Sequence, residues 1–143
     1  MTPIAKGRLF VISGPSGVGK GTLRKALFKS VQGLEYSVSC TTREPRNREI
    51  DGVDYQFIDF DHFKDLVKEG RFLEWAEVHG HFYGTLKENV ERILESGRDA
   101  ILEIDVQGAL QVKESEPEAV LIFIMPPSEE ELRSRLKRRG TEK

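Results

Sequence analysis

The chain has 143 residues, enough for one domain with a hydrophobic core. Its net charge of −2 excludes a general attraction to nucleic acid or anionic membranes, and no apolar stretch is long enough for a signal peptide or a bilayer span. A single cysteine, Cys40, excludes an internal disulfide and is typical of a reducing compartment, so we expect a cytoplasmic protein.

Apolar and helical patterns alternate in the first part of the chain. The continuously apolar run 8–12 predicts a buried strand of a parallel sheet. Leu23, Ala26 and Leu27 recur after it at helical spacing, which predicts a helix. The stretch 34–40 alternates and is rich in Val, Ser and Tyr, so it predicts a second strand.

The middle of the chain breaks this alternation. Residues 41–58 are polar and rich in turn-forming residues, and they end in a strand-like segment at 55–58. A short helical pattern follows and stops at Gly70, and 72–78 predicts another strand. We therefore expect 41–84 to form a small inserted lobe rather than part of the main sheet.

Helix and strand alternate again toward the end of the chain. Thr85 and Glu88 have the spacing of a capping box, which predicts that a helix starts there. Apolar runs at 100–104 and 120–125 predict two buried strands with a helix between them, and Ser128 predicts the start of a final helix. This alternation is typical of the α/β class, with a parallel sheet covered by helices on both faces.

A glycine-rich segment joins the first strand to the first helix. Its spacing, Gly14-x4-Gly19-Lys20, and its strand–loop–helix context predict a P-loop that binds the phosphates of a nucleoside triphosphate. Lys20 adds a charge that can reach the terminal phosphates. Gly21 replaces the hydroxyl residue that usually contacts Mg²⁺, and the hydroxyl comes one position later. The expected phosphate-binding residues are Gly14, Pro15, Ser16, Gly17, Val18, Gly19, Lys20, Gly21 and Thr22.

A second polar cluster lies in the turn-rich middle segment. Arg43 and Arg46 flank Pro45 on one loop, and an arginine grips phosphate oxygens through two hydrogen bonds at once. Tyr55 and Tyr83 can donate O–H bonds to the same oxygens. The cluster predicts a second phosphate site, although the pattern by itself is equally that of a solvated basic loop.

Further motifs accompany the P-loop, in the order of one family: Ser39-x3-Arg43-x2-Arg46, Asp54-Tyr55-x-Phe57, Phe72-Leu-Glu74-Trp75-Ala76, His81-Phe-Tyr83-Gly84-Thr85, Leu102-Glu-Ile-Asp105-Val-Gln-Gly108, Pro126-Pro-Ser128 and Arg139-Gly-Thr-Glu142. On these motifs, from Phe10 to Glu142, the chain resembles guanylate kinases. The resemblance implies a cytoplasmic enzyme of purine metabolism that transfers phosphate from ATP to GMP with Mg²⁺ as cofactor. Its partners would be ATP and GMP, with no nucleic acid or membrane.

The resemblance also implies a division of the single domain 1–143. The P-loop kinase core would comprise 1–40 and 85–127, with a GMP-binding lobe at about 41–84 and a partial lid at about 128–143. Family members continue with more lid, a further strand and a C-terminal helix. We therefore expect a fragment that is unstable, weakly active or self-associating through the exposed edge of the 120–125 strand.

Individual residues acquire roles from the same resemblance. The residues that would hold the GMP phosphate are Arg43, Arg46, Tyr55 and Tyr83. The residues that would read guanine are Ser39, Glu74 and Thr85. Asp105 joins the GMP-binding set and, with Thr22, lies near Mg²⁺ or its waters. The residues that would neutralise charge during phosphoryl transfer are Lys20, Arg43, Arg135 and Arg139.

The chemistry of guanine supports the role of Glu74. Guanine presents two donors side by side, N1–H and the 2-amino group, and one carboxylate can accept both. Adenine has an acceptor at N1 and no 2-amino group, so it would leave a desolvated carboxylate unpaired. Two alternatives stay open: a non-catalytic module of this family that binds phosphorylated peptides, and a kinase for another monophosphate such as AMP or dTMP.

Overall fold

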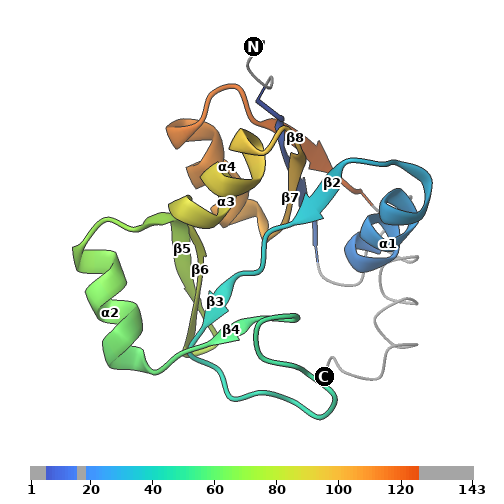
Figure 1. Cartoon of the computed structure of the whole chain (residues 1–143). Coiled ribbons are helices and arrows are strands. Elements are labelled where there is room, and N and C mark those ends of the chain that lie inside the picture. The colour runs from blue at the N-terminus through green and yellow to red at the C-terminus, as the bar shows by residue number, and fades with distance from the viewer. Residues whose placement is uncertain (1–5, 16–18, 126–143) are drawn as a thin grey trace.

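The computed structural model describes residues 6–15 and 19–125, which form two sheets with helices around them (Figure 1). The elements are β1 (Leu9–Ser13), α1 (Lys20–Ser30), β2 (Leu34–Tyr36), β3 (Cys40–Thr41), β4 (Gln56–Phe57), α2 (Phe60–Lys68), β5 (Phe72–Val78), β6 (His81–Leu86), α3 (Lys87–Glu95), β7 (Asp99–Glu103), α4 (Val106–Ser115) and β8 (Val120–Phe123). The helix expected after Ser128 lies outside the described residues. None of the helices in this part of the chain combines the length and the apolar character that a bilayer crossing demands.

The first sheet is parallel, with strand order β2-β7-β1-β8. Its central strands, β1 and β7, are the continuously apolar runs of the sequence. Val11 faces Leu102 in this pairing, and both side chains are fully buried. The parallel arrangement confirms the α/β expectation, because strands buried on both faces have no polar alternation.

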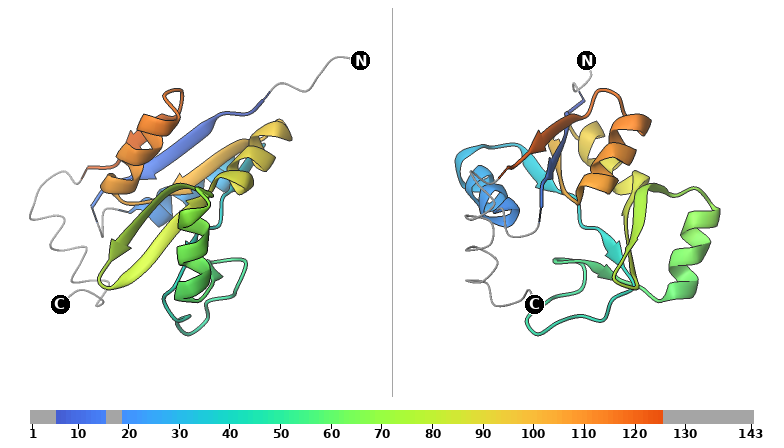
Figure 2. Two further views of the ribbon diagram at one scale, coloured as in Figure 1. Left: turned by 90° about the vertical axis from the view of Figure 1, so that its left-hand side faces the viewer. Right: turned by 180° about the vertical axis from the view of Figure 1, so that it is seen from behind.

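Helices cover both faces of this sheet. Helices α3 and α4 lie on one face and α1 lies on the other (Figures 1 and 2). The main core lies between the sheet and helices α3 and α4. Its buried residues are Leu9, Val11, Leu73, Val90, Ile93, Ala100, Leu102, Ala109, Val112 and Ala119. Helix α1 has no fully buried residue, so the opposite face is covered less completely within the described residues.

The second sheet has the order β4-β3-β6-β5 and contains the long hairpin β5–β6. Its own core contains Cys40, Phe63, Leu66, Phe72 and Leu86, so helix α2 packs against it through Phe63 and Leu66. Asp59 starts α2 by accepting a hydrogen bond from the backbone N–H of His62. The hairpin turns at His79 and Gly80, both with positive φ.

The strand expected at 34–40 is two strands in different sheets. Residues 34–36 form β2 beside β7, and the N–H of Ser37 still donates to the carbonyl oxygen of Ile101. The chain then crosses to the second sheet, where Cys40 in β3 pairs with Gly84 and Gln56. Alternation of side chains indicates extended backbone but does not identify the partner strand, so the break was invisible in the sequence.

The capping box expected at Thr85 is also wrong. Helix α3 begins after Leu86, and no side chain caps it. Thr85 is still part of β6 and is fully buried, and its hydroxyl donates to Oε1 of Glu74 at 2.8 Å. A hydrogen bond from the Thr85 hydroxyl to a buried carboxylate is stronger than the hydrogen bond to a helix N–H that the spacing suggested.

Candidate functional site

The P-loop region follows the carboxyl end of β1. Gly19 is the N-cap of α1 and has φ of 103°, in the left-handed region that favours glycine. Lys20 opens the helix, and its Nζ donates a hydrogen bond to the carbonyl oxygen of Gly14 at 2.9 Å. A helix N-terminus and a lysine charge therefore lie at one end of the sheet, an arrangement that attracts phosphate.

Only some of the remaining P-loop residues are among those the structure describes. Gly21 and Thr22 belong to the first turn of α1, and Pro15 follows Gly14. A Cβ on Gly21 would lie 3.6 Å from Oε1 of Glu103, so the start of α1 is close to the carboxyl end of β7. Ser16, Gly17 and Val18 lie outside the described residues.

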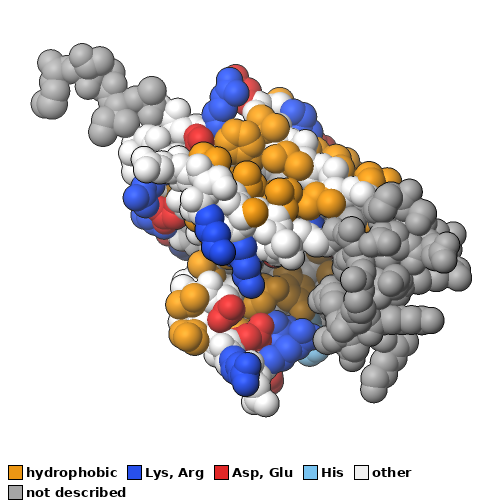
Figure 3. Space-filling model, turned by 90° about the vertical axis from the view of Figure 1, so that its right-hand side faces the viewer, with side chains coloured by type: hydrophobic (Ala, Val, Ile, Leu, Met, Phe, Trp, Pro, Cys, Tyr) orange, Lys and Arg blue, Asp and Glu red, His pale blue; other side chains and the backbone are white. Residues whose placement is uncertain are grey.

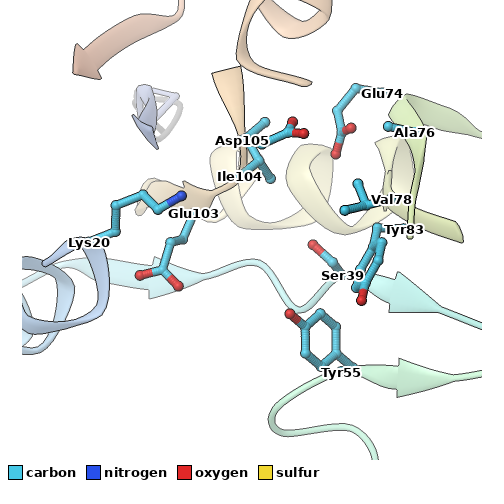
Figure 4. Close-up of a pocket in the computed structure, with 10 residues that line it drawn as sticks. All are labelled: Lys20, Ser39, Tyr55, Glu74, Ala76, Val78, Tyr83, Glu103, Ile104 and Asp105. Carbon is cyan, nitrogen blue, oxygen red and sulfur yellow. The ribbon is translucent and has the colours of Figure 1, made fainter. Parts of the chain in front are cut away.

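A cavity of about 310 Å³ lies between this end of the parallel sheet and the second sheet (Figure 4). Its lining residues are Lys20, Ser39, Tyr55, Glu74, Ala76, Val78, Tyr83, Glu103, Ile104 and Asp105. Predicted triphosphate-binding and guanine-binding residues therefore share one cavity, although they come from distant parts of the chain.

Glu74 is the most unusual ionisable group of the cavity. It lies in β5 and is only 5% exposed. Burial raises its pKa to about 7, the hydrogen bond from Thr85 opposes this shift, and the Asp105 charge adds to it. The carboxyl groups of Glu74 and Asp105 point toward one another (Figure 4). A carboxyl group with this pKa is ready to ionise when a ligand brings donors to it.

Arg43 is held beside the tyrosines rather than extended into solvent. Its guanidinium makes two hydrogen bonds to Glu49, at 2.9 and 3.1 Å, and lies 5.2 Å from the ring centre of Tyr55. These bonds to Glu49 raise the pKa of Arg43, with a smaller contribution from Tyr83. The backbone N–H of Arg46 donates to the same Glu49 carboxylate at 2.7 Å. One acidic side chain therefore fixes the loop that carries both arginines.

Two carboxylates follow one another at the carboxyl end of β7. Asp105 caps α4 by accepting from the backbone N–H of Gly108 at 2.8 Å. Glu103 lies 3.5 Å from the guanidinium of Arg24, and its Oε1 is buried without a hydrogen bond in the described part of the chain. No group of three or more potential metal ligands occurs within the described ranges. Oxygen donors beside a phosphate site nevertheless fit Mg²⁺, which binds through one or two carboxylates together with phosphates and water.

Four expected residues are not among those that line the cavity: Thr85, Arg43, Thr22 and Arg46. Thr85 is bonded to Glu74 of the cavity wall, and Arg43 lies beside Tyr55. Arg135 and Arg139 lie outside the described residues. Two contributors were missed in the sequence: Glu49, whose position in a basic loop was a signal, and Gly108, whose contact with Glu74 depends on how α4 packs.

A family model for guanylate kinase matches residues 6–143. The chain belongs to the guanylate kinase family. Curated guanylate kinases from Caldanaerobacter subterraneus subsp. tengcongensis, Oceanobacillus iheyensis and Clostridioides difficile are 58%, 55% and 51% identical to it. These matches cover 96%, 96% and 97% of this chain but 66%, 66% and 68% of the relatives. The chain thus spans about two thirds of the length of the curated relatives it matches.

A solved structure supports the same assignment. The crystal structure of guanylate kinase from Anaplasma phagocytophilum matches this chain with a TM-score of 0.78 and 41% sequence identity. The match covers 94% of this chain and 68% of that one. The resemblance and the α/β fold class expected from the sequence are both confirmed. The division into core, lobe and lid and the roles of the individual site residues stay predictions.

Proposed function

We propose that this chain binds ATP and GMP and transfers the γ-phosphate of ATP to GMP, giving ADP and GDP. The observation that carries the proposal is a cavity with Lys20 of the P-loop at one side and the buried Glu74, bonded to Thr85, at the other. The family assignment favours this reaction over the peptide-binding module and over another monophosphate kinase.

Guanine recognition rests on Glu74 and its neighbours. Thr85 holds one carboxylate oxygen, and the cavity excludes most water from the other. The ionised carboxylate accepts N1–H and the 2-amino group of guanine, and Ser39 adds a hydroxyl from the same wall. Adenine in this place would leave the charge unpaired, which disfavours AMP.

The GMP phosphate is assigned to the basic loop and the tyrosines. Arg43 and Arg46 supply positive charge, and Tyr55 and Tyr83, whose rings are in contact, supply hydroxyl donors from the cavity wall. Glu49 holds Arg43 in place and offsets its charge until the phosphate arrives. The phosphate then competes for a guanidinium that is already ordered, so little side-chain entropy is lost on binding.

The ATP phosphates are assigned to the P-loop, at 14–22. Lys20 and the N-terminus of α1 offset the repulsion between donor and acceptor, which is the main requirement of phosphoryl transfer. Asp105, with Thr22 and Glu103 nearby, is the side chain proposed to hold Mg²⁺ through its waters. The ion would neutralise charge on the β- and γ-phosphates when bound. Arg135 and Arg139 are proposed to contribute further charge.

We further propose that the protein acts on these nucleotides in the cytoplasm, as part of purine metabolism, and not on nucleic acid. The net charge of −2 and the single cysteine support this setting. We also propose self-association through β8, which is an outer strand of the parallel sheet in the described residues.

The test combines turnover and binding. The chain is incubated with ATP·Mg²⁺ and GMP, AMP, UMP or dTMP, and ADP is followed, while calorimetry measures the affinity for each monophosphate. GMP-selective turnover is the expected result. Tight GMP binding without turnover would instead indicate a binding module, and turnover with another monophosphate would overturn the proposal.

A further inference from the structure

Helix α4 presents two residues, one turn apart, to the strand that carries Glu74. Gly108 and Gln111 are separated by three positions and so lie on the same side of the helix. Both face β5 rather than the parallel sheet, since Gly108 approaches Glu74 and Gln111 is bonded to Trp75. Consecutive residues of β5 are therefore in contact with α4.

Gln111 bonds the backbone of β5 through both ends of its amide group. Its Oε1 accepts from the N–H of Trp75 at 3.3 Å, and its Nε2 donates to the carbonyl oxygen of Trp75 at 3.1 Å. In the described residues β5 is the outer strand of its sheet, with β6 on its other side. The Gln111 amide thus supplies the two bonds that a neighbouring strand would supply, and it fixes the strand one residue after Glu74.

Gly108 leaves the space that the Glu74 carboxylate occupies. A Cβ at this position would lie 2.9 Å from Oε2 and 3.3 Å from Cδ of Glu74, and 3.2 Å from Oδ1 of Asp105. These distances are too short for a carbon beside an oxygen already held on its other side, because Thr85 bonds Oε1 at 2.8 Å. A side chain at 108 would therefore turn the carboxylate away from its present orientation.

We infer that Gly108 and Gln111 are positioning residues that set the place and orientation of the Glu74 carboxylate for guanine. This inference rests on the proposed function, because it assumes that Glu74 accepts hydrogen bonds from the base. Neither residue lines the cavity: Gln111 acts through the strand that carries Glu74, and Gly108 acts through Glu74 and through Asp105, to which its N–H is bonded. Helix α4 belongs to the core of the parallel sheet, and through this contact it controls selectivity in the second sheet.

The pair of nucleotides GMP and IMP isolates this role. The two have the same phosphate, ribose and N1–H, and only GMP has the 2-amino group from which Glu74 would accept a second hydrogen bond. A displaced carboxylate loses this bond, so the preference for GMP over IMP should fall by about tenfold or more. A general loss of structure would weaken GMP and IMP equally and leave the ratio of their affinities unchanged.

The experiment measures both dissociation constants by calorimetry for the chain and for three variants. Gln111→Leu removes both bonds to Trp75 at similar volume, and Gly108→Ala adds one methyl group against Glu74. Gln107→Leu is the matched control, since Gln107 is exposed on the same helix and has no side-chain bond in the described residues. Alanine favours a helix more than glycine does, which offsets part of the cost of the added methyl group, and the melting temperature of each variant is measured beside its affinities.

The expected result is a reduced GMP-to-IMP preference in Gln111→Leu and Gly108→Ala, with ATP affinity retained in Gln111→Leu and no change in Gln107→Leu. An unaltered preference in both positioning variants, or an equal loss for GMP and IMP, would overturn the inference alone. If the original chain does not prefer GMP, the proposed function fails as well, and the two failures are distinguished by that first measurement.

Discussion

Glu74 links ligand binding to proton binding because its carboxyl group is buried. Its ordinary pKa is 4.5, and the folded chain raises this pKa to about 7, so the folded state holds the proton more tightly than the unfolded state does. Such a group stabilises the fold fully below pH 4.5, and this contribution disappears as the pH rises through 7. The site therefore has a stability cost at the pH where its carboxylate is needed.

Glu74→Gln should relieve that cost. Glutamine is neutral at every pH and still accepts a hydrogen bond from Thr85. The variant therefore avoids the free-energy cost of ionising a buried group, which is about 3 kcal/mol at high pH. Urea unfolding at pH 5 and pH 8 measures the effect. We expect the variant to gain more stability at pH 8 than at pH 5, and an equal change at both would contradict the prediction.

Guanine selection should follow the same ionisation. Below pH 7 the empty site is mostly protonated, and a protonated carboxyl group accepts fewer bonds from the base, so the GMP affinity should fall by about tenfold per pH unit. IMP is the reference, because its phosphate titrates as that of GMP does. Calorimetry between pH 5.5 and 8 should show the GMP-to-IMP preference declining with acid in the original chain and staying flat in Glu74→Gln.

At the scale of elements, the sequence predicted the parallel sheet well. Its strands are continuously apolar because helices cover both faces, and 9–13, 99–103 and 120–123 lie where those runs occur. The division of the segment 34–40 between two sheets was harder to predict, because both halves are extended and differ only in the strands with which they pair. Pairing depends on the packed molecule and leaves little trace in local alternation.

The candidate site shows the same division. Lys20 and Arg43 could be predicted because a phosphate needs glycines, lysine and arginine at characteristic spacings. The resemblance placed Thr85 with Glu74 among the residues that read guanine, but the hydrogen bond between them was not predicted, and the spacing of Thr85 suggested a helix cap instead. Gly108 appeared in the sequence only as the last residue of a motif, and its closeness to Glu74 depends on how α4 packs on β5. Contacts between elements far apart in the chain are what the sequence left open.

Gly84 lies close to the Phe72 ring within the β5–β6 hairpin. A Cβ there would lie 2.7 Å from two ring atoms of Phe72, which is itself packed on Phe63. Gly84→Ala should therefore destabilise the chain by about 1–3 kcal/mol through overpacking. His81→Ala, at an exposed position of the same strand, should change stability by less than about 0.5 kcal/mol. Urea unfolding compares the two, and a neutral Gly84→Ala would contradict the packing argument.

For the whole molecule, the side that carries α1 has hydrophobic side chains gathered on its surface (Figure 3). Phe28 on α1 and Phe123 on β8 are 37% and 44% exposed. Among the residues that the structure describes, β8 is also an outer strand, so its backbone and side chains can both contact another molecule. These two properties together support the proposed self-association.

Phe123→Lys should reduce that association. A charge on an outer strand disfavours strand pairing between molecules, while the GMP site at the other sheet is unaffected. Light scattering across a concentration series should show a smaller average mass for this variant and unchanged GMP affinity. Leu110→Lys, at an exposed position on α4, is the control. Equal masses for Phe123→Lys and the original chain would exclude β8 as the contact.

The buried Cys40 makes the second sheet accessible to a chemical probe. It is 2% exposed, and burial raises the pKa of its thiol to about 11, so an alkylating reagent reaches a reactive thiolate only when β3 separates from its neighbours. Because the chain has one cysteine, the rate of alkylation reports how often this sheet opens. Saturation with GMP should slow alkylation, whereas AMP, which the site disfavours, should have no effect at the same concentration.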